Sequence, residues 1–193
     1  MRVLVACEFS GVVREAFRAR GHDAVSCDLL PSEQPGPHIE GNILDHLSEG
    51  WDLMVAFPPC THLSWAGGRH LNEKRADGRT ETALDFVRAL RKAPIKRIAI
   101  ENPRGDLWRI RRPTQIIEPY QFGDPWQKAT CLWLYNLPRL NPTNIVESRG
   151  KWVDTGKKPG QMRGKHRAPK DRSRTFPGIA AAMADQWGGL IRP

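Results

Sequence analysis

Short apolar runs that alternate with helical stretches constrain the fold of this chain more than any other feature. The apolar runs cover residues 2–7, 22–27, 52–57 and 96–100, and stretches with the spacing of an amphipathic helix cover residues 11–21 and 82–92. Strands that alternate with helices indicate a parallel sheet with right-handed crossover connections. The sequence therefore predicts an α/β fold with a mostly parallel sheet.

The pattern changes after residue 113. Residues 116–140 carry aromatic side chains and short apolar runs without helical spacing, which favours antiparallel strands. Residues 31–41, rich in glycine and proline, and residues 60–78, mostly polar, are expected to be loops. A last helix is predicted over residues 178–187. We divide the chain into an α/β domain over residues 1–140, a basic segment over 141–174, and a C-terminal helical segment over 175–193 that packs back on the first domain.

Positive charge is concentrated in one segment. The chain has 30 Lys and Arg against 21 Asp and Glu, a formal net charge of +9. Ten of the basic residues and only two aspartates lie between Arg149 and Arg174, so the rest of the chain is nearly neutral. A basic segment of this kind indicates a polyanion partner, nucleic acid first. The alternative is a solubilising surface loop.

The composition argues against several classes of protein. No apolar stretch approaches the ~20 residues needed to cross a membrane. The first residues do not form a signal peptide, because Glu8 interrupts the apolar run. The four cysteines, Cys7, Cys27, Cys60 and Cys131, form no CxxC pair, which indicates neither a zinc site nor a disulfide framework. We expect a cytoplasmic protein that binds no membrane and no metal.

Polar residues follow the predicted strands at 8–11, 28, 58–60 and 101–103. Ligands of an open parallel sheet bind beyond the carboxyl ends of its strands. The first turn lacks a GxGxxG sequence, so the fingerprint of a pyrophosphate site is missing. Asp28 is placed to accept hydrogen bonds from ribose hydroxyls, which suits an adenosine cofactor without a diphosphate. The alternative is a solvated turn residue.

Cys60 and Glu101 are the candidate catalytic residues. Cys60 follows two prolines at the end of an apolar run, where a rigidly held thiol can act as a nucleophile. The alternative for this cysteine, which we accept for the other three, is a small buried hydrophobic residue. Glu101 ends the neighbouring strand, and a partly buried carboxyl can donate a proton near neutral pH. Its alternative is a turn or helix-capping residue.

Several of these segments together resemble the DNA cytosine-C5 methyltransferases. Residues 52–67, DLMVAFPPCTHLSWAG, are similar to the nucleophile motif of that family, and Glu101-Asn102-Pro103 resembles its Glu-Asn-Val motif. Phe9 and Gly11 resemble the first cofactor motif, and residues 41–43 resemble a Gly-Asp-Ile motif with Asn42 in place of the acid. In residues 125–130, Lys128 and Thr130 stand where the family has two arginines. The basic segment 141–174 occupies the place of a much larger target-recognition domain.

The resemblance implies a Rossmann-like methyltransferase fold that uses S-adenosylmethionine and acts on cytosine, with double-stranded DNA as the expected partner. It implies that Cys60 attacks C6 of a flipped-out cytosine, that Glu101 contacts N3 and the exocyclic amine, and that the segment 61–78 closes over the base. It also implies that Lys128 is a catalytic residue. The implied cofactor-binding residues are Phe9, Ser10, Gly11, Asp28, Asn42, Ile43 and Pro58, and the implied DNA-binding residues are Ser64, Lys157, Lys158, Arg163 and Lys165.

Two alternatives to this function remain open. The same fold could act on RNA, on a free nucleotide or with a modified cofactor. The chain could also be a catalytically silent nucleic-acid-binding protein.

Overall fold

A seven-stranded sheet forms the centre of the computed structural model, which describes residues 1–148 and 173–190. Its strand order is β3-β2-β1-β4-β5-β7-β6. The strands are β1 (Arg2–Ala6), β2 (Asp23–Asp28), β3 (His38–Glu40), β4 (Leu53–Ala56), β5 (Arg97–Pro103), β6 (Gln115–Ile117) and β7 (Thr130–Tyr135). The first five strands pair in parallel, and β7 lies antiparallel between β5 and β6. The predicted mostly parallel α/β sheet is confirmed, and it is compatible with a Rossmann-like fold.

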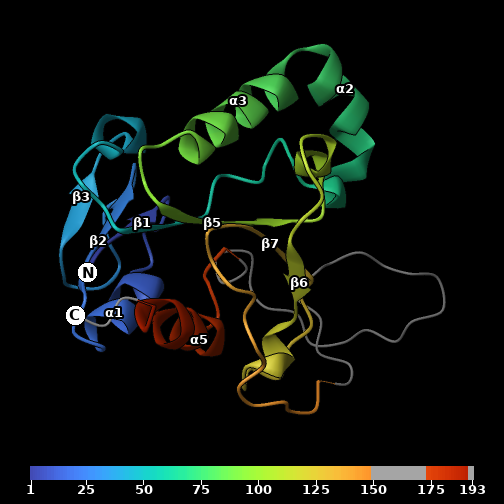
Figure 1. Ribbon diagram of the computed structural model, residues 1–193. Coiled ribbons are helices and arrows are strands. Elements are labelled where there is room, and N and C mark those ends of the chain that lie inside the picture. The colour runs from blue at the N-terminus through green and yellow to red at the C-terminus, as the bar shows by residue number, and fades with distance from the viewer. Residues whose placement is uncertain (149–172, 191–193) are drawn as a thin grey trace.

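Helices cover both faces of the sheet (Figure 1). Helices α1 (Val12–Arg18) and α5 (Pro177–Gly188) pack together on one face, and α2 (Leu71–Ala76) and α3 (Arg79–Arg91) lie over the other. Side chains of a strand alternate between the two faces, so Val3 and Val5 join the core under α1 and α5. Leu4 and Ala6 join the core under α3.

Most of the expected elements are present, with ends shifted by a few residues. The antiparallel strands expected after residue 113 are confirmed as β6 and β7. The expectation of irregular loops was wrong in two places. Strand β3 lies within residues 31–41, and residues 60–78 hold α2 and the 3₁₀ helix η2 (Trp65–His70). These elements have three to six residues each, too few to show a hydrophobic period.

The order in which the chain connects the strands reverses between β1 and β4. The chain runs from β1 outward through β2 to β3, and from β4 outward through β5, so the connections after these two central strands diverge. A crevice at such a topological switch point is the usual place for a ligand in an open α/β sheet. The segments that follow β1 and β4 are residues 7–11 and 57–60, which carry two of the motifs identified above.

Candidate active site

Cys60 differs from the other cysteines in exposure. It is exposed in the turn after β4, whereas Cys27 and Cys131 are buried in the sheet and Cys7 is half-buried. Burial is the main reason that the pKa of Cys7 is raised to about 12 and the pKa values of Cys27 and Cys131 to about 11. These three thiols are therefore protonated at neutral pH and poorly suited to act as nucleophiles.

The turn that carries Cys60 is held by hydrogen bonds to three separate elements. The Cys60 carbonyl accepts the backbone N–H groups of Leu63 and Ser64, at 3.0 and 2.8 Å. The carbonyls of residues 61, 62 and 63 accept, in that order, Lys74 Nζ of α2, Thr80 Oγ1 of α3, and the backbone N–H of Asp106 in the 3₁₀ helix η3 (Asp106–Arg109). Every carbonyl from residue 60 to 63 thus has a donor, which fixes the path of the backbone at the thiol.

Gly105 allows the close approach that this arrangement needs. Its backbone pairs with Ser64 in an isolated bridge. A Cβ atom at position 105 would lie 2.1 Å from the carbonyl oxygen of Leu63, which no side chain tolerates. A glycine at this position therefore allows the segment after β5 to pack directly against the backbone of the Cys60 turn.

A single side chain joins the ends of β4 and β5. Asn102 is buried, and its Nδ2 donates to the Pro58 carbonyl at 2.8 Å. The bond connects the turn of Cys60 with the residue next to Glu101. The two candidate catalytic residues therefore stand on strand ends that are paired side by side and linked across their turns.

Glu101 faces an open hollow of about 300 Å³ together with Lys128. Burial raises the pKa of the Glu101 carboxyl, and the positive charge of Lys128 partly opposes that shift. Thr130 of β7 and Phe57 also line the hollow. Its far wall comes from residues 173–176 and from α5. The arrangement provides a carboxyl that retains its proton at higher pH than usual, beside a cation.

At the carboxyl end of β1, Glu8 occupies the start of α1. Its buried carboxylate accepts the backbone N–H groups of Val13 at 2.7 Å and Arg14 at 3.3 Å, and Ser10 Oγ donates to it at 3.0 Å. In dinucleotide-binding folds a pyrophosphate takes this place. Gly11 has a φ of 73°, a left-handed conformation that favours glycine, and begins the helix directly. The geometry suits a ligand without a diphosphate.

The remaining cofactor residues implied by the sequence lie along the same edge. Asp28 ends β2 and accepts the Leu30 N–H at 3.0 Å, and the exposed Asn42 accepts the Leu44 N–H at 3.2 Å through Oδ1. Phe9 is half-buried, whereas Ile43 and Pro58 are buried. Of the seven exposed large apolar side chains among the described residues, Leu29, Leu30 and Leu44 belong to these two turns. Apolar side chains beside acceptors are what an adenosine group requires.

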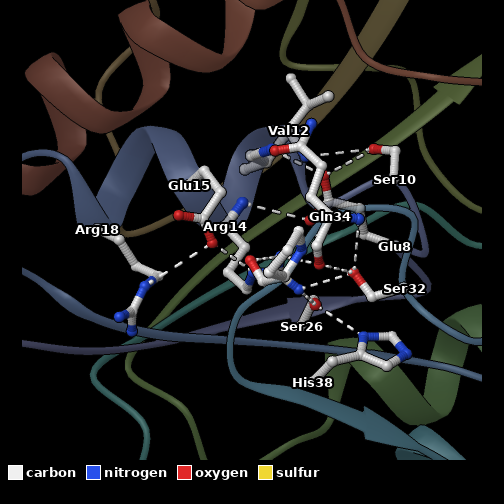
Figure 2. A network of polar contacts seen from close by, with 12 residues as sticks. Glu8, Ser10, Val12, Arg14, Glu15, Arg18, Ser26, Ser32, Gln34 and His38 are labelled. Carbon is white, nitrogen blue, oxygen red and sulfur yellow. Dashed lines mark hydrogen bonds and ion pairs between the residues drawn. The ribbon is translucent and has the colours of Figure 1, made fainter.

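Sequence reasoning missed Arg14, whose side chain is completely buried (Figure 2). Its Nη1 donates to Ser26 Oγ at 2.9 Å and to Ser32 Oγ at 3.0 Å. Nη2 donates to the carbonyls of residues 34 and 35, and Nε donates to Glu15. All five N–H groups are used. The guanidinium thereby holds the segment after Asp28 against α1, and no sequence pattern separates it from a solvent-facing arginine.

We expect Arg14→Met to lower the free energy of unfolding by about 3 kcal/mol, because it removes all five hydrogen bonds that the buried guanidinium donates. The matched control is Arg18→Met on the same helix, whose exposed guanidinium pairs with the same Glu15 at 3.7 Å and should change stability by less than about 0.5 kcal/mol. Urea denaturation measures both. Equal losses in the two variants would contradict the structural role of Arg14.

Several other sequence expectations can be located in the structure. Ser64 caps η2, where its Oγ accepts the Ala66 N–H, and it lies four residues from Cys60. The four basic residues expected to bind DNA, at positions 157, 158, 163 and 165, lie outside the described residues. Arg174, at the end of the basic segment, forms a two-bond ion pair with Glu33, at 2.7 and 2.9 Å. Since the Glu33 N–H donates to the Phe9 carbonyl, Arg174 is tied to the segment that follows β1.

Asp106 and Trp65 were also missed. Asp106 is completely buried beside the Cys60 turn, yet in sequence it is one acid among many. Trp65 could have been noticed, since it is the one aromatic residue among the mostly polar residues 60–78.

No protein-family model matches the chain, and a search of curated proteins found no significant relative. Within residues 1–148 and 173–190, no helix has the length and apolar character to cross a bilayer, and no group of three His, Cys, Asp or Glu side chains could hold a metal ion.

Proposed function

We propose that the chain is a DNA cytosine-C5 methyltransferase that uses S-adenosylmethionine. One observation carries the proposal: the Asn102–Pro58 hydrogen bond links the turn of an exposed cysteine to the residue next to Glu101, whose carboxyl has a pKa raised by burial. A thiol nucleophile paired with a proton-donating carboxyl on adjacent strand ends is what addition to C6 of a pyrimidine requires. The resemblance of residues 52–67 to the nucleophile motif of this family supports the same conclusion.

The residues at the carboxyl ends of β1, β2 and β3 fit S-adenosylmethionine better than a dinucleotide. Glu8 occupies the backbone N–H groups that a pyrophosphate would use, while Asp28 offers a carboxylate for the ribose. Leu29 and Leu44 provide exposed apolar surface for the adenine, and Asn42 Oδ1 has a second lone pair for its amine. When bound, S-adenosylmethionine supplies an electrophilic methyl group.

The residues of the chain would activate the cytosine. The Cys60 thiolate adds to C6, which breaks the C5–C6 double bond and places the electron pair on C5, while Glu101 donates its proton to N3. Lys128, in the same hollow, would donate a hydrogen bond to the base carbonyl. Once C5 carries the methyl group, a water molecule takes the C5 proton; the electrons of that C–H bond re-form the double bond and expel the Cys60 thiolate, and the N3 proton returns to Glu101.

The substrate base must leave its stack to reach these groups, because a paired and stacked ring exposes neither face to a thiol. In this proposal the basic segment 149–174 contacts phosphates of the DNA and takes the place of a larger recognition domain.

We expect 5-methylcytosine in the DNA of an expression host that makes the protein, and none when it makes Cys60→Ser. Mass spectrometry of nucleosides from digested DNA and RNA measures this. Purified protein with methyl-labelled S-adenosylmethionine should likewise transfer label to DNA. Label found in RNA or in free nucleotides instead would change the substrate, and no transfer to any of them would reject the proposal.

A further inference from the structure

Trp65 is a large aromatic side chain that is held rigidly and still exposed. Its Nε1 donates to Asp106 Oδ1 at 2.8 Å, and its ring lies against Trp108 with centroids 5.3 Å apart. Even so, 41% of the residue is accessible to solvent. It stands five residues after Cys60, at the start of η2. An exposed aromatic side chain with a fixed orientation is suited to contact a partner, because little side-chain entropy is lost on binding.

The anchor of this indole is a buried, ionised carboxylate. Asp106 accepts Arg75 Nε at 2.7 Å and Nη2 at 2.5 Å in addition to Trp65. The bonds from Arg75 are the main reason that the pKa of Asp106 is lowered. The backbone N–H of Asp106 also donates to the Leu63 carbonyl, so one residue positions both the indole and the Cys60 turn.

Three arginines flank, in sequence, Asp106 and Trp108, the two side chains that the indole contacts. Arg104, Arg109 and Arg112 are exposed on the segment that follows β5. The Arg104 carbonyl accepts the backbone N–H of Trp65 at 3.1 Å. The Arg112 guanidinium lies 4.6 Å from the centroid of the Trp108 ring. The charge of Arg109 is close enough to lower the pKa of Asp106. We call Trp65, Arg104, Arg109 and Arg112 the indole–arginine surface.

We propose that the indole–arginine surface binds an unstacked segment of the substrate strand, with Trp65 stacked on a base and the three arginines on flanking phosphates. A flat ring that every base can stack on, combined with guanidinium groups for the backbone, is the general chemistry of single-strand recognition. The inference rests on the proposed function only in taking nucleic acid as the substrate. It assigns strand contacts to described residues next to the nucleophile, apart from the basic segment 149–174.

The first test uses Trp65 variants and a fluorescein-labelled single-stranded oligodeoxynucleotide, with binding followed by anisotropy without cofactor. We expect Trp65→Ala to weaken binding by about 5- to 150-fold, the measured range for one base–aromatic stack. Trp65→Phe keeps a stacking ring but loses the bond to Asp106, and it should recover most of the affinity. Equal loss in both variants would show that only the anchor matters, and unchanged affinity in Trp65→Ala would overturn the stacking contact.

The second test concerns charge and does not depend on the Trp65 variants folding. The triple variant Arg104→Gln, Arg109→Gln and Arg112→Gln should reduce the slope of log affinity against log salt by about 2, since each phosphate contact on a single strand contributes about 0.7. The matched control replaces Lys92, Lys96 and Arg139 by glutamine, three exposed residues near the amino end of β5. It removes equal charge and should leave the slope unchanged.

The two proposals can fail separately. Equal salt slopes in the two triple variants would overturn the indole–arginine surface even if the wild-type protein methylates DNA. Weakened binding confined to the surface variants would support it even if no methyl transfer occurs.

Discussion

Methyl transfer by Cys60→Ala should fall by at least about 10⁴-fold, because the attacking atom is removed and nothing on the described strand ends replaces it. Cofactor affinity should stay near the wild-type value, since the residues proposed to hold the cofactor lie mainly in the segments after β1, β2 and β3. Single-turnover assays with labelled cofactor measure the rate, and calorimetry measures the affinity.

The covalent step can be checked directly with DNA that contains 5-fluorocytosine. Fluorine cannot leave C5 as a proton does, so the wild-type protein should remain attached to the DNA on a denaturing gel, and Cys60→Ala should not. Cys131→Ala is the control, because this buried thiol is opposite Asn102 in the sheet and cannot reach substrate. An adduct that persists in Cys60→Ala would show that another nucleophile is used.

Glu101→Gln should lower the rate by roughly 10²- to 10⁴-fold, the usual contribution of a general acid. Gln keeps the shape of the side chain but has no proton to give to N3. In the wild-type protein, kcat/KM should decline as the pH rises through the raised pKa of Glu101 and the carboxyl loses its proton, and this decline should disappear in the variant. Glu81→Gln, an exposed carboxyl on α3, serves as the control and should keep the wild-type profile.

Stability should separate this catalytic loss from damage to the fold. Burial raises the pKa of Glu101 above its unfolded value of 4.5, so the native state binds the proton more tightly than the unfolded chain does. The free energy of unfolding therefore decreases as pH rises from the unfolded to the native pKa. Gln carries no such penalty, and Glu101→Gln should be at least as stable as the wild type at pH 8. A less stable variant with a wild-type rate would make Glu101 a structural residue.

The strand ends could be predicted because they depend on local pattern. The apolar runs of β1, β4 and β5 are terminated by Glu8, by two prolines, and by Glu101-Asn102-Pro103, so the order of these elements already places Cys60 and Glu101 at one edge of a parallel sheet. The placement of Glu101 and Lys128 in one hollow is harder to derive from local pattern, because it depends on the antiparallel return of β7 beside β5.

Buried polar networks could not be predicted, because they join residues far apart in the sequence. Arg14 meets carbonyls about 20 residues later, and Asp106 meets Arg75 and Trp65 from 31 and 41 residues earlier. Both side chains are charged, and most such residues lie at the surface. Only the packed structure shows that their full sets of hydrogen bonds are satisfied internally. For Asn102, the sequence indicated a motif, but its bond to Pro58 required the structure.

The hydrogen bonds of residues 60–63 bear on which partner, the protein or the nucleic acid, must change conformation in the proposed reaction. Three elements hold the carbonyls of residues 61–63, and the Cys60 carbonyl is bonded within the turn, so the thiol has little freedom to move toward its target. In the proposed reaction the cytosine must move instead, and the unpairing and rotation take place in the nucleic acid. A base that is mismatched, damaged or close to a strand end needs less free energy to be unpaired and rotated out of the stack. Because the Cys60 turn is held rigidly, the ease with which the DNA is locally deformed would determine which cytosines react first.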